Sequence, residues 1–391
     1  MNPFLLRWNP NISSRKADTA MRSAQFASDL FQALCGRDGN VLLSPHSIAV
    51  ALATLGLGAC GETLEAILHL LHTETADQLR LSVGFDDAVL RALRGTGVDY
   101  ESDTSVWIRK GLRLLREYRR EAEEHFAAHA HEITMDEKGR KTVNAHVSKT
   151  THGLIPELLS NPLRSDTQLI VTNALWFKAQ WESPFDSDRT SPGIFHAPDG
   201  DVRVPFLRQT GDFRRLRWET LDSVLLPYEG EKVDFVILLP RNGATLADIE
   251  TDDDLWDILL ENWQDFDHTE PERLSLSMPK LSLQFDDSLV SALQRIGAGK
   301  IFRETANFSG IARTDKPLMV SEIVHKTRLD LDEDGTEAAA ATAIYDCVTG
   351  VPEKRPRPKP FRVDRPFLFL VRHRDTGAIL FIGRVENPSF P

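Results

Sequence analysis

Cysteine is scarce in this chain, whose 391 residues include only Cys35, Cys60 and Cys347. The count is odd, and the spacings match no zinc-binding or redox motif. A disulfide framework is therefore not expected, and a chain of this length does not need one to fold. We interpret Cys35 and Cys60 as small buried apolar side chains. Cys347 has no cationic neighbour in the sequence, which favours an inert thiol.

Long apolar runs are also missing. No run of about 18 apolar residues occurs, so no transmembrane helix is expected and a membrane partner is excluded. The N-terminal segment has only the short apolar run Phe4–Leu6, and it lacks the longer apolar core of a secretory signal. We expect residues 1–20 to form a flexible N-terminal extension and residues 21–391 to form one domain.

Positive charge is in deficit. Lys and Arg number 46 against 58 Asp and Glu, which gives a formal net charge of -12. Nucleic-acid binding requires a positive footprint, so no nucleic-acid partner is expected. One local cluster, at Arg113, Arg116, Arg119 and Arg120, has helical spacing. It fits a solvated helix face, and the alternative is a site for a polyanion.

The chain has no internal repeat, no long Gly/Ser linker and no metal, phosphate or nucleophile motif. We therefore expect no enzyme activity, no metal and no cofactor. The first third has helical periodicity, and "SPHSIAVALATLGLG" is apolar nearly all round, as in a helix at the centre of a molecule. Later segments such as "TQLIVTNALWFKAQW" and "VDFVILLP" favour strands. Helices first and strands later predict an α+β domain.

What the sequence does contain is an unusual stretch at residues 332–350, "DEDGTEAAAATAIYDCVTG". Four alanines follow an acidic patch and a glycine, ahead of a segment rich in Pro and Arg. Alanine is the best helix former, so the run is consistent with a plain helix. The other explanation is that small side chains are required because this segment must slide past its neighbours.

Five strings, in order, resemble the serpin family: "NVLLSPHSIAVALATLGLGACGETLEAI", "TNALWFKAQWESPF", "ANFSGI", "VSEIVHKTRLDLDEDGTEAAAATA" and "PFLFLVRHRDTGAILFIGRVENP". The resemblance runs from about residue 24 to 388. It implies a serpin fold of three β-sheets with eight to nine helices and an exposed reactive loop, here about residues 333–360. Most family members inhibit serine or cysteine proteases by suicide, because the cut loop inserts as a strand into the main sheet.

The resemblance places the loop hinge at the start of the alanine stretch. Alternate residues of a strand face the same side, so Thr336 shares a face with Ala338, Ala340, Thr342 and Ile344. Small side chains there can enter a packed sheet without clashes. Gly335 allows the chain to bend at the start. The implied hinge residues are Glu333, Gly335, Thr336, Ala338, Ala339, Ala340, Ala341 and Thr342.

Two further groups of residues follow from the resemblance. The sheet-opening region consists of Trp181, Lys280 and Glu333, with an ion pair implied between Lys280 and Glu333. A central polar cluster under the sheet consists of Ser44, Ser47, Asn173 and His325. This cluster is not interpreted as a catalytic triad, because no carboxylate motif or nucleophile elbow accompanies it.

The bond that a protease attacks is assigned by counting. In most inhibitory members the attacked residue is the seventeenth from the hinge glutamate, which gives the bond Thr349–Gly350. Tyr345–Asp346 and Lys354–Arg355 stay open as alternatives. A small β-branched residue at Thr349 favours elastase- or subtilisin-like targets, whereas Tyr345 would suit a chymotrypsin-like enzyme. Asp346 falls on the inward face, where a charge is costly to bury.

The sequence therefore predicts a monomeric suicide inhibitor of a serine protease, with a cysteine protease as a further target class. The alternative within the family is a non-inhibitory serpin, with a chaperone or carrier role, whose loop is cut as a plain substrate. Heparin activation is not expected, because residues 75–95 carry no dense basic stripe. The family resemblance favours an extracellular location, and the lack of a visible secretory signal leaves a cytoplasmic one open.

Overall fold

The computed structural model describes residues 11–252, 256, 266, 268–315, 317–336 and 357–388, with side chains from residue 21 onward. Eight α-helices lie within these ranges, and none of them is long and apolar enough to cross a membrane. They are α1 (Asn11–Gln32), α2 (Pro45–Gly56), α3 (Glu62–Leu70), α4 (Ala76–Arg91), α5 (Arg116–Phe126), α6 (Glu137–Thr150), α7 (Leu246–Glu250) and α10 (Val290–Arg295). Helix α1 begins inside the segment 1–20 that we expected to be a flexible extension.

The strands form three sheets. The six-stranded sheet has the order β11 (Leu281–Ser288), β13 (Val320–Leu331), β14 (Gly335–Thr336), β5 (Leu169–Gln180), β2 (Val98–Arg109), β4 (His129–Ile133). The nine-stranded sheet has the order β1 (Val41–Leu43), β17 (Ile379–Val385), β16 (Phe367–His373), β9 (Val233–Pro240), β8 (Leu221–Pro227), β7 (Gly200–Arg217), β10 (Glu272–Pro279), β15 (Lys359–Arg362), with β6 (Ser191–Ala197) paired to β7. The third sheet pairs β3 (Arg113–Leu114) with β12 (Ala312–Arg313).

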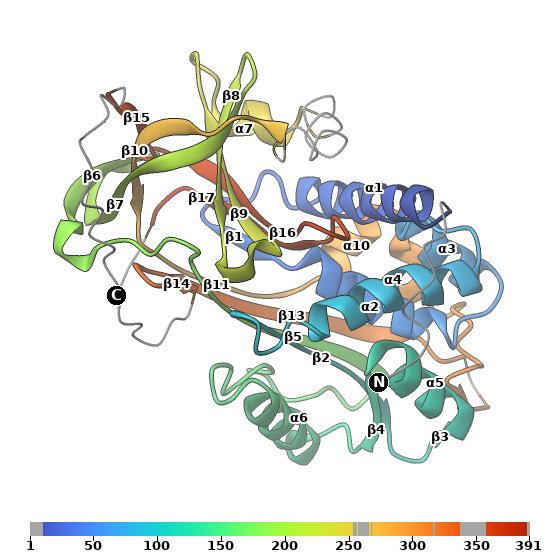
Figure 1. The fold of residues 1–391 in the computed structure, drawn as a ribbon. Helices are drawn as coiled ribbons and strands as arrows, with labels where there is room; N and C mark the ends of the chain where they lie inside the picture. Colours follow the sequence, from blue (N-terminus) through green and yellow to red (C-terminus); the bar gives the residue numbers. More distant parts are fainter. Residues whose placement is uncertain are drawn as a thin grey trace.

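Helix α2 lies in the centre of the molecule, between the six-stranded sheet and the strands β16 and β17 (Figure 1). Nearly all of its side chains are buried, as its apolar sequence predicts. Ser44 caps its first turn by accepting a hydrogen bond from the backbone N–H of Ser47, and Pro45 occupies the first helical position. The α+β class, the central helix and the three sheets are therefore as expected.

Helix α6 covers the opposite face of the six-stranded sheet, away from α2 (Figure 1). Val143 and Val147 of α6 join a hydrophobic cluster of their own with Ile170 of β5 and Val324 of β13. The remaining buried apolar residues form one large cluster on the α2 side of the sheet. The two central strands of the sheet are thus packed on both faces, which explains why their sequences are apolar on both sides.

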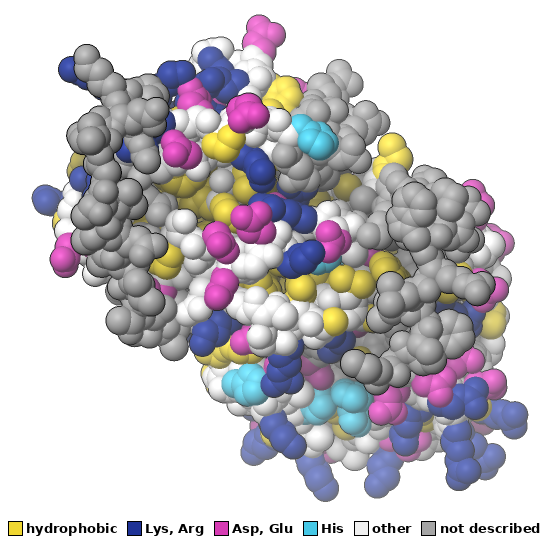
Figure 2. Space-filling model, in the orientation of Figure 1, with side chains coloured by type: hydrophobic (Ala, Val, Ile, Leu, Met, Phe, Trp, Pro, Cys, Tyr) yellow, Lys and Arg dark blue, Asp and Glu magenta, His cyan; other side chains and the backbone are white. Residues whose placement is uncertain are grey.

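Acidic and basic side chains are interspersed over the face drawn in Figure 2. Of the arginine cluster, Arg116 opens α5 but Arg113 lies in β3, so the four residues do not share one helix. Cys35 and Cys60 are half-buried rather than fully buried. Burial raises the pKa of the Cys35 thiol to about 11, as expected for an unreactive thiol.

Candidate functional site

The two central strands of the six-stranded sheet, β5 and β13, are paired over only part of their length. They run parallel and pair from Val320 with Leu169 to Thr327 with Leu175. Beyond that point the short strand β14 lies between them. Thr336 pairs with Leu331 of β13 on one side and with Ala179 of β5 on the other. One end of the sheet is therefore already parted, and the hinge residues Gly335 and Thr336 occupy the gap.

A tight turn connects β13 to β14. The side-chain carboxylate of Asp332 accepts hydrogen bonds from the N–H groups of Asp334, at 3.0 Å, and Gly335, at 3.3 Å. Gly335 has φ of 151°, and a Cβ at this position would lie 2.0 Å from the carbonyl oxygen of Ala179. Only glycine fits there, because any side chain would collide with the backbone of β5. The glycine is required for β14 to enter the sheet at this point.

Trp181 holds the backbone of this turn. Its indole N–H donates to the carbonyl oxygen of Asp332 at 3.0 Å, and its backbone N–H donates to that of Asp334 at 2.9 Å. The indole ring is stacked on Tyr228, with ring centroids 4.5 Å apart and an interplanar angle of 4°. The structure therefore gives Trp181 a specific task in the sheet-opening region, which is to fix the path of the chain from β13 into β14.

Thr336 is completely buried, and its side chain points toward the α2 side of the sheet. Its hydroxyl oxygen lies 2.7 Å from the hydroxyl oxygen of Tyr228, which is also buried. Burial raises the pKa of Tyr228 to well above its usual range, so the phenol stays protonated. Sequence reasoning missed Tyr228, because it lies 108 residues from Thr336 and belongs to no motif.

Glu333 forms an ion pair with Lys280 at the same end of the sheet, with a distance of 2.5 Å between the ammonium nitrogen and the carboxylate. Thr190 donates a further hydrogen bond to this carboxylate at 2.7 Å. Burial acts to raise the pKa of Glu333, but hydrogen bonds from Lys280 and Thr190 prevail and lower it. Thr190, also missed from the sequence, belongs to the connection between strands β5 and β6.

The central polar cluster lies where β5 and β13 are still paired. Asn173 of β5 is next to His325 of β13, and its side-chain oxygen accepts hydrogen bonds from His325 Nδ1, at 2.7 Å, and from the hydroxyl of Ser47. Its amide nitrogen donates to the carbonyl oxygen of Ser47, at 3.1 Å, and to Thr104 Oγ1, at 3.0 Å. All four residues predicted for this cluster are brought together. Thr104, contributed by β2, is an additional member.

His325 is held as a neutral imidazole in one orientation. Its Nε2 accepts a hydrogen bond from the backbone N–H of Ser44 at 3.2 Å, which assigns the proton to Nδ1, where Asn173 accepts it. Burial lowers the pKa of His325 to about 3. A second proton on Nε2 would oppose the N–H of Ser44, so this network of fully satisfied polar groups exists only with neutral histidine.

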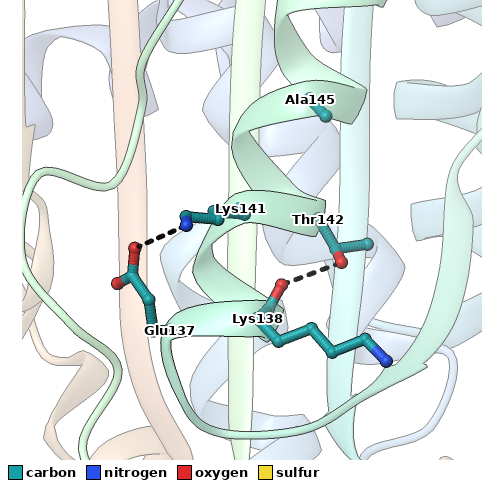
Figure 3. Close-up of a pocket in the computed structure, with 5 residues that line it drawn as sticks. All are labelled: Glu137, Lys138, Lys141, Thr142 and Ala145. Atoms are coloured by element: carbon teal, nitrogen blue, oxygen red, sulfur yellow. Dashed lines mark hydrogen bonds and ion pairs between the residues drawn. The ribbon is translucent and has the colours of Figure 1, made fainter.

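Helix α6 covers the path along which β14 would extend. It is attached to the sheet by its apolar cluster and by His146, whose Nε2 lies 2.9 Å from the carboxylate of Asp103 on β2. Figure 3 shows the other side of α6, which has a shallow hollow of 620 Å³. Lys141 there pairs with Glu137 at 3.8 Å, so this side is a solvated face.

The rest of the predicted loop lies outside the described residues. This applies to Ala338, Ala339, Ala340, Ala341 and Thr342 of the hinge and to Thr349 and Gly350 of the assigned bond. Within the residues that the structure describes, no group of His, Cys, Asp or Glu side chains is arranged to hold a metal ion. The described residues thus form a sheet whose central strands are parted at one end and joined at the centre by buried polar groups.

Comparisons with known proteins agree with this geometry. The family model for serpin (serine protease inhibitor) matches residues 21–388. An uncharacterised serpin-like protein of Thermococcus kodakarensis is 34% identical over 371 residues, which cover 93% of this chain and 84% of that protein. The leukocyte elastase inhibitor of Bos taurus is 33% identical over 387 residues, covering 94% and 98%. The crystal structure of Serpin48 from Tenebrio molitor matches with a TM-score of 0.82 at 26% identity, covering 95% and 98%. The chain therefore belongs to the serpin family.

Proposed function

We propose that this serpin is a suicide inhibitor of serine proteases. The observation that carries the proposal is strand β14, which pairs with β5 through Gly335 and Thr336 and with β13 through Thr336. Because the first hydrogen bonds between the loop and its two neighbouring strands are already formed, insertion does not have to start a new strand. It only has to add residues to the existing one. The bovine relative is named as an inhibitor of leukocyte elastase, which supports a serine protease as the target.

The pairing of Thr336 with Ala179 sets the register for the rest of the loop. If the antiparallel ladder continues, Ala338 comes opposite Phe177, Ala340 opposite Leu175 and Thr342 opposite Asn173. Phe177, Leu175 and Asn173 are all fully buried on the α2 side of the sheet. Incoming side chains on this face must be small, because a densely packed core leaves no room for large ones. The alanine stretch meets this requirement.

If the ladder continues in this register, Asp346 comes opposite Leu169, which is the first residue of β5. A charge in the middle of the sheet would be costly, but at the end of the strand it can reach water. The Asp346 side chain is therefore compatible with full insertion, and it marks the point where the inserted strand leaves the sheet. This supports an attacked bond that lies beyond Asp346, such as Thr349–Gly350.

In the proposed reaction, the hydroxyl oxygen of the protease serine attacks the carbonyl carbon of Thr349. The bond to Gly350 breaks, and the Gly350 amine leaves with the proton that the protease histidine has taken from the serine. An ester then joins the protease to Thr349. The freed end of the loop extends the ladder from β14, at about 3.3 Å per residue. About 14 residues would carry the attached protease roughly 45 Å along the sheet.

Denaturing gel electrophoresis tests this function. The protein is mixed with elastase, chymotrypsin, subtilisin and trypsin in turn, and the released C-terminal peptide is weighed. An inhibitor gives a complex that survives detergent, since the ester is covalent, and the peptide mass identifies the cleaved bond. A peptide beginning at Gly350 supports the assigned bond, whereas one beginning at Asp346 or Arg355 would move the site to an alternative. If every protease cuts the loop and stays active, the protein is a non-inhibitory serpin.

A further inference from the structure

A pocket of 410 Å³ lies on the nine-stranded sheet and is lined by residues of strands β6, β7, β10 and β15, whose arrangement Figure 1 shows. Its lining includes three arginines, Arg189, Arg208 and Arg362, together with Ser275 and Ser277. A single carboxylate, that of Asp364, also lines it.

The strand register places two of these arginines on either side of one serine. Ser277 of β10 pairs with Arg208 of β7 on one side and with Arg362 of β15 on the other. Residues that pair directly across a sheet share a face. The neighbouring residue Phe361, on the opposite face, is buried in the core. The two arginines therefore stand two strand spacings apart, about 10 Å between their backbones, with a hydroxyl between them.

Within the described ranges, the side chains of Arg189, Arg208 and Arg362 have no ion pair and no hydrogen bond. The Nε atom of Arg208 is buried and has no partner. A buried donor without a partner costs free energy. Asp364 is itself within 3.3 Å of Arg365, which lies outside the pocket lining.

Other basic side chains of the same sheet, unlike those of the pocket, do have carboxylate partners. Arg215 and Arg217 of β7 both pair with Glu272 of β10, and Lys359 of β15 pairs with the same carboxylate. Arg215 is also paired with Asp222 at 2.5 Å. The sheet thus supplies carboxylates to the basic side chains at one end and leaves those around Ser277 without them. Arg189 and Arg362 are exposed to water, whereas the buried Nε atom of Arg208 lacks a partner, which suits a ligand that brings its own negative charge.

We propose that this pocket binds a tetrahedral oxyanion, as carried by a phosphate or sulfate group. Guanidinium groups offer paired N–H donors that match such oxygens, and the serine hydroxyls add further donors between them. Arg208 and Arg362 hold the group from two sides, and Arg189 approaches it from the segment before β6. This proposal does not rest on the protease-trapping function.

Isothermal titration calorimetry of the full chain at 50 mM sodium chloride tests the site. Inorganic phosphate is titrated in one experiment and a heparin-derived hexasaccharide in another, so that a free anion is distinguished from a group carried on a polymer. We expect saturable binding of at least one of the two. Arg208→Gln and Arg362→Gln should each weaken it at least tenfold, because each removes one side of the site. Increasing salt should weaken the binding.

Arg203→Gln is the matched control. Arg203 is an exposed arginine of the same strand β7 that does not line the pocket, so its loss should change the affinity less than twofold. The proposal is overturned if neither probe binds, or if Arg203→Gln weakens binding as much as Arg208→Gln, which would indicate diffuse attraction. If Arg208→Gln does not fold, the exposed Arg362 carries the test. No protease is present, so failure here is separate from failure of the inhibitory function.

Discussion

At the scale of the residue, His325 connects the two central strands of the sheet and the central helix through its imidazole ring. It joins β13 to β5 through Asn173 and to α2 through Ser44, so the two strands that must part are held by the same imidazole. The bonds depend on its being neutral, and burial lowers its pKa to about 3. In the unfolded chain a histidine titrates near pH 6.5. Acid therefore favours the unfolded form through this residue.

We predict a pH dependence of stability that is specific to His325. A group with a lowered folded-state pKa contributes fully above the unfolded pKa, so its contribution is present above about pH 6.5 and is lost progressively toward pH 3. Within that window the free energy of unfolding should fall by roughly 1.4 kcal/mol per pH unit on account of this one group. Urea unfolding at pH 4.5 to 7.5 measures the slope.

His325→Gln should remove the contribution of the buried imidazole to the slope of unfolding free energy against pH. His69→Gln, at an exposed position, should leave that slope unchanged. The two variants are compared with the native protein over the same pH series. Equal slopes for the native protein and His325→Gln would show that the buried imidazole is not what makes the protein sensitive to acid.

At the scale of the element, β14 is a strand of two residues that is held by more contacts than its length suggests. Gly335 fits against the backbone of β5, and Thr336 forms a hydrogen bond with Tyr228. The ion pair between Glu333 and Lys280 lies just before the strand. These contacts fix which residues face the core. Because a slip by one residue exchanges the two faces of a strand, they also fix the register of anything that follows.

Replacing Thr336 with arginine should block insertion. The arginine would bring a charge into a fully buried position beside Tyr228, at a cost of several kcal/mol unless it is expelled from the sheet. We expect Thr336→Arg to convert the inhibitor into a substrate, so that the moles of inhibitor consumed per mole of protease trapped rise at least tenfold. Titration of protease activity measures this ratio.

Glu337→Arg is the control for this change. It introduces the same side chain one position later, and by the alternation of a strand it belongs to the other face. We expect it to keep its inhibitory ratio within about a factor of two, an allowance that corresponds to less than 0.5 kcal/mol. If both variants lose inhibition equally, the effect arises from charge near the hinge and not from the buried register of β14.

At the scale of the whole molecule, the proposed mechanism requires a native state that is not the most stable arrangement of the chain. The six-stranded sheet has a parted end, and the ladder between β5 and β14 stops after two residues. Its completion would add a central strand bonded on both sides. The uncut loop is attached at both its ends, to β14 and to β15, so only cleavage would release it to insert fully. The native state is then kinetically held.

Cleavage of the loop should therefore raise the thermal stability. About ten added residues, from position 337 to the Asp346 that marks the end of the inserted strand, would each gain roughly 1 kcal/mol from net backbone hydrogen bonding, which amounts to about 10 kcal/mol. We expect the midpoint of thermal unfolding to rise by at least about 10 °C after the loop is cut. Circular dichroism of intact and cleaved protein measures the rise. Cleaved Thr336→Arg should show little gain, and a similar midpoint for intact and cleaved native protein would contradict the mechanism.

Much of the fold could be predicted from local patterns. The apolar periodicity of α2, the double-sided apolar strands β9 and β16 and the hairpin of β16 with β17 all correspond to segments that the sequence marks clearly. The helical start of α1 at Asn11 was not predicted, because the segment before residue 21 has no marked apolar face to indicate packing. Which residues form the hinge and the central polar cluster was predicted only from the resemblance to the serpin family.

The sequence by itself determined the small alternating residues of the loop, the glycine before them and the hydrophobic strands that build the sheet, because these follow from periodicity and side-chain size. Only the tertiary structure decided that Tyr228, Thr190 and Thr104 complete the site, since each contacts a residue far away in the chain. It also decided that β14 already lies in the sheet and that Arg208 and Arg362 flank Ser277. Pairing between distant strands brings such residues together, and no local pattern encodes it.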